Sequence, residues 1–395
     1  MDFAFGAQDE AFRDQVRTWL SEHLTGDYAA LGGAGSPGQE EGFAIRREWE
    51  RELGRGGWIG LTWPEQHGGR GASVIQKLIF TEEYVKANAP ARVGFFGEDL
   101  FGPTMIAFGT DEQKRRFLPP ILTADEFWCQ GFSEPDAGSD LGNVGTRGVL
   151  DGDEWVVNGQ KVWTTLAHHA DWCFVVTRTD PDVPKHKGLS FLLVPMDQPG
   201  VEVKPLVQIT GDAEFNEVFF TDARTARDNV LGGVTNGWKV AMGTLGFERG
   251  TAFLASQLRF EHELRQTVEL AAKHGATPDP VVRQRLADAY IGLKVLRFNR
   301  LRAFTAMSKS SDGQPGPEAS INKLQWSNWH RRLGELQMDI MGPWSQVVGD
   351  GYHLDELQLT FLFSRSETIY AGSSEIQRNI IGERVLGLPR EPAVA

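Results

Sequence analysis

Residues 131–140 read Gly-Phe-Ser-Glu-Pro-Asp-Ala-Gly-Ser-Asp and lie where the sequence changes from a helical to a β-rich pattern. The stretch follows a strand-like run and places hydroxyl side chains and backbone N–H groups in one tight turn. Such a turn is able to donate hydrogen bonds to a planar heterocycle or to a phosphate. Taken alone, the same residues also fit an ordinary capped turn.

Two helical regions flank the β-rich part of the chain. Before it, apolar residues recur at helical spacing, and we predict helices over 9–24, 40–53, 73–88 and 111–118. After Gly232-Gly233 the helical period returns, and we predict helices over 236–273, 280–310, 318–342, 353–369 and 374–385. Long amphipathic helices in series indicate an up-down bundle.

The β-rich part begins at about residue 127, where the period of the apolar residues changes to 2. Short turns separate its runs, which is typical of a small antiparallel barrel or sandwich. We therefore predict an α+β fold in three domains: an N-terminal helical domain (1–125), a central antiparallel β-barrel or sandwich (126–234) and a C-terminal four-helix bundle (235–395).

Composition narrows the classes of partner. The 395 residues carry 40 Lys and Arg against 53 Asp and Glu, a net charge of −13, which argues against nucleic acid as the main partner. No apolar run approaches the roughly 20 residues that cross a bilayer. Cys129 and Cys173 are too few for a disulfide framework, and no secretory signal pattern is present. We expect a cytoplasmic protein with no membrane contact.

Common signatures of catalytic and metal sites are missing from the sequence. It contains no phosphate-binding Gly-x-x-x-x-Gly-Lys loop, no Gly-x-Ser-x-Gly nucleophile turn and no His-Glu-x-x-His helix. His168 and His169 are possible metal ligands, but no third ligand lies at a usual spacing, so we predict no metal site. The tryptophans Trp155, Trp163 and Trp172 crowd one segment, which indicates either a core or a site for a flat ligand.

Three motifs, in order, resemble those of the acyl-CoA dehydrogenase family. They are residues 131–140, the run Lys-Val-Trp-Thr-Thr at 161–165 and the run Ile-Tyr-Ala-Gly-Ser-Ser-Glu-Ile-Gln-Arg-Asn at 369–379. The order of helical, β-rich and helical parts agrees with that family over essentially the whole chain. The resemblance implies an FAD-dependent enzyme of lipid metabolism and β-oxidation that converts an acyl-CoA thioester to the trans-2-enoyl-CoA.

The resemblance also implies which residues contact the cofactor. Ser133, with the backbone of Phe132, is expected beside the isoalloxazine, and Trp163 is expected to stack on it. Thr165 is expected near the flavin N5, and Ser139 near both the flavin phosphate and the pantetheine of the substrate. In the C-terminal motif we expect cofactor contacts from Ser373 and Glu375, the latter either structural in a helix first turn or on the flavin ribose.

The catalytic base departs from the commonest family pattern. Many members carry a glutamate directly after the tyrosine of the C-terminal motif, whereas this sequence has Ala371 there. A minority place the base before an arginine on a bundle helix, and Glu248-Arg249 matches that arrangement. We therefore predict Glu248 as the base, Arg249 as a substrate-side cation and the backbone N–H of Ala371 or its neighbour as a donor to the thioester oxygen.

A second departure concerns the part of the FAD site that members of the family lend to a neighbouring subunit. The runs Arg-x-x-Phe-Gly and Gln-x-x-Gly-Gly of the family correspond here to residues 273–276 and 339–343. Lys273 lacks the bidentate grip of arginine, Asp339 brings negative charge, and Pro343 removes an N–H. We therefore expect either a homo-oligomer or a hetero-oligomer with two copies each of this chain and a homologous subunit.

Two alternatives to the dehydrogenase remain open at this point. One is a flavin-dependent monooxygenase with the same fold, and Glu248 argues against it. The other is a partner subunit that only completes the site of another chain, and Ser133, Trp163 and Thr165 argue against that. The resemblance further implies an electron-transfer flavoprotein as the acceptor of electrons.

Overall fold

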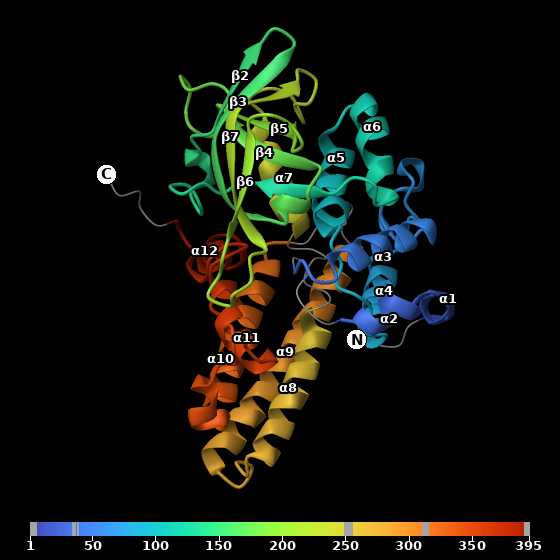
Figure 1. The fold of residues 1–395 in the computed structure, drawn as a ribbon, viewed down its shortest axis with the longest axis vertical. Coiled ribbons are helices and arrows are strands. Elements are labelled where there is room, and N and C mark those ends of the chain that lie inside the picture. The colour runs from blue at the N-terminus through green and yellow to red at the C-terminus, as the bar shows by residue number, and fades with distance from the viewer. Residues whose placement is uncertain (1–5, 34–36, 38, 249–255, 310–315, 391–395) are drawn as a thin grey trace. The chain divides into compact units, whose positions relative to one another are not determined.

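The structure, a computed structural model, describes residues 6–33, 37, 39–248, 256–309 and 316–390 (Figure 1). These residues form two compact units. The first unit comprises Met1–Gln208 and Asp212–Glu248, and the second comprises Ile209–Gly211 and Arg249–Ala395. None of the helices in the described ranges is both long and apolar enough to cross a lipid bilayer.

The first unit begins with helices. They are α1 (Ala7–His23), α2 (Gly26–Leu31), α3 (Phe43–Arg55), α4 (Val74–Lys86), the π-helical η2 (Phe96–Phe101), α5 (Gly102–Phe108) and α6 (Asp111–Leu122). Capping boxes at Ser73 and Thr110 start α4 and α6. The predicted helices correspond to α1, α3, α4 and α6, whereas α2, η2 and α5 were not predicted.

A buried ionic network lies among these helices. Lys77 on α4 is 2.9 Å from Glu98 Oε1 and 3.3 Å from Asp99 Oδ1. Arg92 joins Glu98 to Glu50, with Nη2 2.6 Å from Glu98 Oε2 and Nε 2.8 Å from Glu50 Oε1. Because these charges are paired, their burial among the helices is tolerated.

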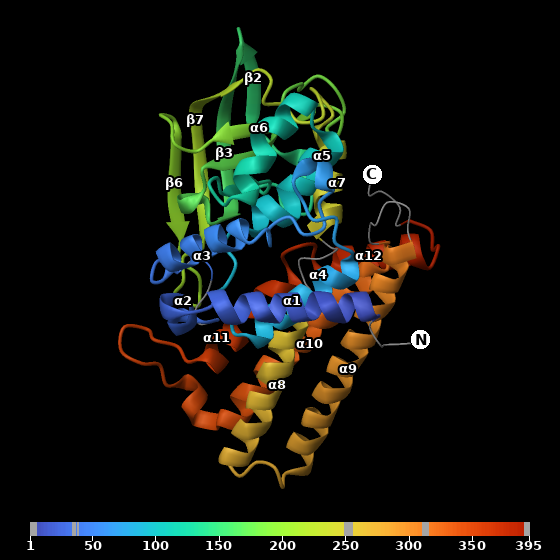
Figure 2. The same cartoon turned by 90° about the vertical axis from the view of Figure 1, so that its right-hand side faces the viewer.

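One seven-stranded sheet follows the helices. Its strands are β1 (Trp128–Gly131), β2 (Arg147–Asp151), β3 (Glu154–Thr165), β4 (Trp172–Arg178), β5 (Leu189–Pro195), β6 (Val201–Leu206) and β7 (Phe215–Ala226). They are ordered β1-β4-β2-β3-β7-β6, with β5 paired to β4, and Figure 2 shows β3, β7 and β6 side by side. Most pairs are antiparallel as predicted, but β4 pairs in parallel with both β1 and β2, so the sheet is mixed and the prediction of an antiparallel sheet is wrong for these two pairs.

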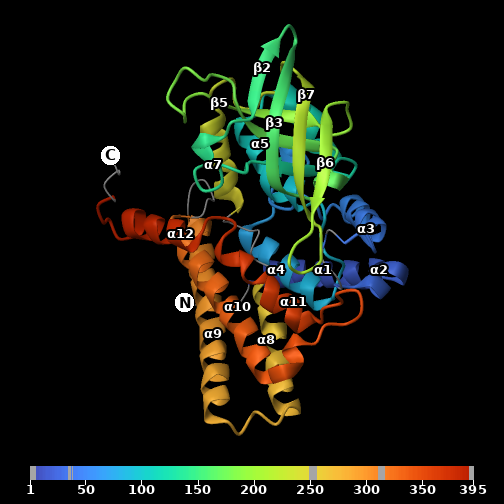
Figure 3. The ribbon, with the colours of Figure 1, turned by 60° about the vertical axis from the view of Figure 1, so that its left-hand side comes forward.

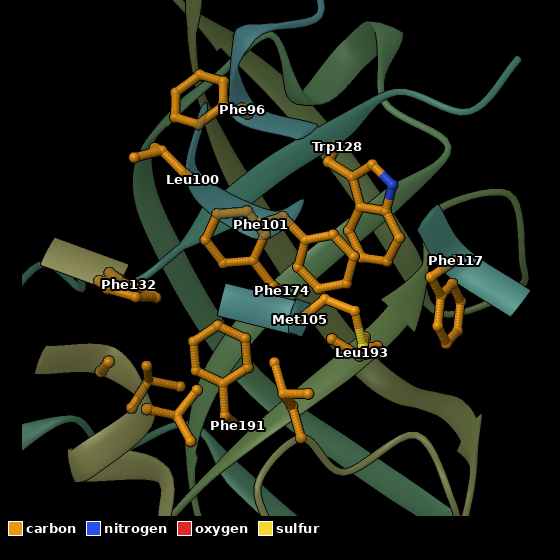
Figure 4. Close-up of a cluster of buried hydrophobic side chains, with 14 of the residues drawn as sticks. Phe96, Leu100, Phe101, Met105, Phe117, Trp128, Phe132, Phe174, Phe191 and Leu193 are labelled. Atoms are coloured by element: carbon orange, nitrogen blue, oxygen red, sulfur yellow. The ribbon is translucent and has the colours of Figure 1, made fainter. Parts of the chain in front are cut away.

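The central core of this unit is aromatic and joins the sheet to the helices around it (Figure 4). Phe101 stacks on Trp128 with ring centroids 3.6 Å apart. The ring of Phe132 packs edge-on against Phe174 and Phe191, at 5.9 and 6.0 Å. This packing anchors Phe132, the second residue of the turn at 131–140.

Helix α7 (Gly237–Glu248) ends the first unit and packs on the same core through Val240 and Ala241. We predicted one helix over 236–273, and the described residues of that range form α7 and, in the second unit, α8 (Ser256–Lys273). Residues 249–255, between α7 and α8, lie outside the described part of the chain.

The second unit is the helical bundle. Its remaining helices are α9 (Pro280–Lys309), α10 (Ala319–Met341), α11 (Glu356–Phe363) and α12 (Ser374–Ile380). Figure 3 shows α8, α9 and α10 running alongside one another. Their buried faces meet in a core of Phe260, Leu264, Leu293, Leu296, Trp326, Trp329 and Leu333. The predicted α+β class with a β-rich centre and a C-terminal bundle is confirmed.

Candidate functional site

The turn at 131–140 leaves strand β1 and folds back on itself. The N–H of Glu134 donates to the carbonyl of Ala137 at 2.9 Å, and the N–H of Ala137 donates back at 3.1 Å. Ser133 is half-buried and Ser139 is exposed. Among the described residues, the N–H of Ser133 has no acceptor, so it is free to bind a ligand.

Lys161 lies beneath this turn and is completely buried. Its Nζ donates to Phe132 O at 3.1 Å, to Val176 O at 2.8 Å and to Glu134 Oε1 at 2.7 Å. An ammonium has three N–H donors, and here each has an acceptor. The three bonds tie strand β3, strand β4 and the turn together.

The carboxylate of Glu134 completes this network from the other side. It accepts the N–H of Gly145 at 2.6 Å and that of Thr146 at 2.9 Å. Burial acts to raise the pKa of Glu134, but the charge of Lys161 and these hydrogen bonds hold it below its usual value. Glu134 is therefore a carboxylate that fixes the backbone of the turn.

A bulge in β3 connects the turn to Trp163. The register of β3 against β7 shifts between Lys161 and Thr164, and the N–H of Val162 donates to Ser133 O at 2.9 Å. Trp163 has a left-handed φ of 59°, a rare conformation for a bulky residue. Its side chain is 59% exposed.

The tryptophans of this segment therefore differ in role. Trp155 is buried and its Nε1 donates to Arg227 O at 3.0 Å, which fits the interpretation as core. Trp163 is exposed and touches the edge of Phe215 with ring centroids 6.1 Å apart. An exposed indole ring is a surface on which a flat polar ring is able to stack. Thr165, half-buried, ends the same strand.

The histidine pair after β3 has a neighbour that sequence spacing did not indicate. His169 Nε2 is 3.6 Å from Glu40 Oε2, and the ligand atoms of Glu40, His168 and His169 lie within 4.8 Å of one another. His169 stacks on Phe43 at 3.5 Å, and burial and His168 lower its pKa to about 4. Since Glu40 is 88% exposed, we assign this group no metal.

In the bundle unit, the C-terminal motif forms a strained turn. Ala371 has a φ of 51° and Gly372 a φ of 89°. The buried side-chain amide of Gln377 donates to both carbonyls, at 3.1 Å for Ala371 and 3.2 Å for Gly372. These bonds hold the backbone of Ala371, the residue predicted to supply an N–H to substrate, in a conformation that alanine rarely adopts.

Ser373 and Glu375 lie at the start of α12. The Oγ of Ser373 caps the helix by accepting the N–H of Ile376 at 3.3 Å. Glu375 is exposed in the first turn, where its own N–H and then Ser373 lower its pKa. Ser373 is thus a helix cap and Glu375 a first-turn carboxylate, and the predicted contacts of both with FAD stay predictions.

The predicted base and its neighbour are only partly described. Glu248 is the last residue of α7, and its side chain lies outside the described residues. Arg249 also lies outside them. Ala371, by contrast, is described and carries no carboxylate.

We predict that residues 273–276 and 339–343 of the bundle unit face the FAD of a neighbouring subunit, and the surface near Lys273 is acidic. Asp339 pairs with Arg285, whose Nη1 is 2.5 Å from its Oδ2. A hollow of the bundle unit near Lys273 is lined by Glu269, Asp355 and Glu356 as well as by Gln266, Leu270 and Leu357. Three carboxylates against one ammonium repel a diphosphate.

Sequence reasoning missed the groups that support the site. Lys161 is the first residue of the motif at 161–165, but neither its burial nor its bond to Glu134 was predicted. The position of Lys161 on the inward-facing side of an alternating strand is the sequence signal that could have indicated its burial. Gln377, which holds the Ala371 turn, carried no such signal.

A β-rich part between two helical parts in chain order, together with an exposed indole and a Ser133 N–H that has no acceptor among the described residues, fits the class of flavin-dependent oxidoreductases. The chain belongs to the acyl-CoA dehydrogenase family: sequence profiles of its N-terminal, middle and C-terminal domains match residues 6–125, 129–223 and 235–386. FAD is the cofactor of this family, and the exposed Trp163 ring with the unpartnered Ser133 N–H fits a flavin.

Similar proteins are known in sequence and in structure. The chain is 55% identical over 383 residues to the acyl-CoA dehydrogenase IpdE1 of Mycobacterium tuberculosis (strain ATCC 25618 / H37Rv), over 97% of this chain and 98% of the relative. A solved structure described as "Tcur3481-Tcur3483 steroid ACAD" has a TM-score of 0.85 at 29% identity and covers 99% of this chain and 100% of that one. The ChsE4-ChsE5 complex from Mycobacterium tuberculosis has a TM-score of 0.82 at 32% identity, with coverage of 99% and 100%.

Proposed function

We propose that this protein removes hydrogen from Cα and Cβ of an acyl-CoA thioester and forms the trans-2-enoyl-CoA, with Glu248 as the base. The observation that carries the proposal is the alanine at 371, which leaves Glu248 as the carboxylate that matches a base position of the family. When bound, FAD supplies the acceptor for the hydride that leaves Cβ.

The roles of the chain's own residues follow from their chemistry. Glu248 takes the Cα proton, and a desolvated carboxylate is suited to this because burial raises its pKa towards neutrality. The backbone N–H of Ala371 or its neighbour stabilises the negative charge that develops on the thioester oxygen. Arg249 orients the substrate. Ser139 binds its pantetheine and, with Phe132, Ser133, Trp163, Thr165, Ser373 and Glu375, binds FAD.

Replacement of the base tests the proposed reaction. The Glu248→Gln variant should retain FAD but lose reduction of its visible absorbance by acyl-CoA under anaerobic conditions, by about 10²–10⁴-fold in rate. Glu202→Gln, on the exposed side of β6, is the matched control and should reduce at the wild-type rate. Undiminished reduction in Glu248→Gln would exclude Glu248 as the base, and oxygen-dependent product formation would favour the monooxygenase.

The substrate class is proposed from the relatives. One similar structure is named a steroid ACAD, so we propose a bulky, steroid-like acyl group. A steroid side-chain CoA thioester and a short straight-chain acyl-CoA should be compared in the same anaerobic assay. Faster reduction by the short-chain thioester would contradict this choice.

We further propose that the chain assembles with a homologous subunit. The three carboxylates near Lys273 argue against binding the diphosphate of a second copy's FAD, and Arg285 is already paired with Asp339. The chain should be purified alone and after co-expression with a homologous subunit, and its mass and FAD per protomer measured. Stoichiometric FAD in a homo-oligomer would contradict the hetero-oligomer. The electron-transfer flavoprotein is proposed as acceptor on the family resemblance.

A further inference from the structure

Lys161 faces the peptide group that joins Phe132 to Ser133 from its carbonyl side. Its Nζ is 3.1 Å from Phe132 O, and the N–H at the other end of the same peptide is the Ser133 N–H, which has no acceptor among the described residues. An ammonium on the carbonyl oxygen polarises the amide and makes its N–H a stronger donor.

The three contacts of Lys161 require that its side chain is a charged ammonium with three N–H groups. Its three contacts, Phe132 O, Val176 O and Glu134 Oε1, are all acceptors. A neutral amine has two N–H groups and would direct its lone pair at one of them. Burial lowers the pKa of Lys161, but the negative charge of Glu134 opposes that change.

Lys161 and Glu134 also fix the position of the peptide group between Phe132 and Ser133. Glu134 is held by the N–H groups of Gly145 and Thr146, and Ser133 O accepts from Val162 at 2.9 Å. Both carbonyls that precede Glu134 are thus occupied from inside the sheet. The one polar group of this peptide left for a ligand is the Ser133 N–H.

We infer that Lys161 is a positioning residue that tunes the electron affinity of bound FAD by polarising the Phe132–Ser133 peptide, with Glu134 setting the strength of the effect. The inference rests on the proposed function, in which this peptide lies beside the isoalloxazine. A reduced flavin ring is richer in electrons than the oxidised ring, so a stronger N–H donor stabilises the reduced form more.

The two members of the pair are expected to act in opposite directions. Lys161→Met removes the positive charge, weakens the N–H donor and should make reduction of the flavin about tenfold less favourable, which is about 30 mV for a two-electron couple. Glu134→Gln removes the opposing negative charge and should make reduction more favourable as long as Lys161 keeps its third proton, so the potential of this variant is measured at pH 6 as well as at pH 7. If Lys161 and Glu134 only stabilised the turn, the two variants would not change the reduction potential in opposite directions.

The measurement is the midpoint potential of the FAD-loaded protein, titrated with a chemical reductant and a reference dye at pH 7. Lys77→Met is the matched control, because Lys77 is also a buried, carboxylate-paired lysine but belongs to α4. It should destabilise the fold without changing the potential. Equal shifts in Lys161→Met and Lys77→Met, or no decrease in Lys161→Met, would overturn the inference.

The potential measurement tests the role of Lys161 even if one variant loses FAD or if no acyl-CoA reduces the flavin. If Lys161→Met is recovered without FAD, Glu134→Gln decides, since an unchanged or lower potential contradicts the inference. Chemical reduction needs no substrate, so the potentials are measured even if no acyl-CoA reduces the flavin. In that event the proposed dehydrogenase activity fails while the role of Lys161 is still tested.

Discussion

His330 and Glu367 form a buried ion pair in the helical bundle, with His330 Nδ1 2.6 Å from Glu367 Oε2. The other ring nitrogen is 2.8 Å from Glu263 Oε2. Lys323 donates to the carbonyl of Glu367 at 2.6 Å, and Arg259 is 3.8 Å from its Oε1. The network therefore fastens α8, α10 and the segment that leads into the Ala371 turn.

Because of this pair, we expect the free energy of unfolding to decrease as the pH becomes alkaline. Burial alone would lower the pKa of His330, but the hydrogen bonds to Glu263 and Glu367 raise it from 6.5 to about 9. The stabilisation is fully present below pH 6.5 and is lost as the pH rises through about 9, a change on the order of 3 kcal/mol. Thermal midpoints measured between pH 6 and pH 9.5 should fall over this window.

The variant His330→Gln checks the source of that pH dependence. It removes the cation between Glu263 and Glu367 and leaves them Arg259, which is 3.3 Å from Glu263 and 3.8 Å from Glu367. The change should cost up to about 3–5 kcal/mol, and the thermal midpoint should depend less on pH over the same range. His274→Gln at the end of α8 provides an exposed control. An equally steep fall in His330→Gln would assign the dependence to another group.

The two tryptophans of β3 should respond differently to truncation. Trp163→Ala removes an exposed ring, so it should change stability by no more than about 0.5 kcal/mol and yet reduce the FAD retained on purification. Trp155→Ala removes a buried ring and should cost about 3–5 kcal/mol. FAD per protomer and the thermal midpoint are measured together, and wild-type FAD content in Trp163→Ala would exclude stacking there.

Local patterns could be predicted because they depend on near neighbours in sequence. The helical period marked α1, α3, α4 and α6, and the three motifs located the turn, the bulge and the C-terminal turn. The parallel pairing of β1 with β4 could not be predicted, since the alternation of a strand does not identify its partner. Short helices such as α2 lack enough residues to show a period.

The sequence predicted which residues belong to the candidate site, but it did not predict how they are arranged or buried. Charge usually indicates exposure, so the burial of Lys161 against Phe132 and Glu134 was not apparent. Composition alone left Trp163 ambiguous between core and ligand site, and only the motif resemblance predicted stacking. The bulge and the left-handed φ at Trp163 are not apparent in the sequence. The Asp339–Arg285 pair joins two helices that periodicity predicts but does not place side by side.

Moving the base should restore activity to the Glu248→Gln variant. Ala371 already adopts a left-handed φ of 51°, and glutamate meets the same steric limit at Cβ as alanine, so Ala371→Glu should add little strain. The double variant should reduce its flavin with acyl-CoA about tenfold or more faster than Glu248→Gln. Ala371→Gln in the same background is the matched control. Equal rates in the two double variants would contradict the proposed exchange of base positions.

Repair of the acidic surface should increase FAD binding by the chain on its own. Lys273→Arg combined with Asp339→Gln supplies a bidentate cation and removes a carboxylate. If copies of this chain associate, the apparent Kd for FAD should fall about tenfold, since each 1.4 kcal/mol is a factor of ten. Loss of the partly exposed Asp339–Arg285 pair should cost no more than about 1 kcal/mol.

The titration of apoprotein with FAD, followed by flavin fluorescence, measures this effect. Asp288→Asn, on an exposed position of α9, removes a carboxylate elsewhere in the bundle and should leave the Kd unchanged. The oligomeric mass is measured on the same samples, because a second copy must be present to lend its surface. An unchanged Kd in an oligomeric double variant would show that residues 273–276 and 339–343 do not contact FAD. A lower Kd in a monomer would show that they contact the FAD of their own chain.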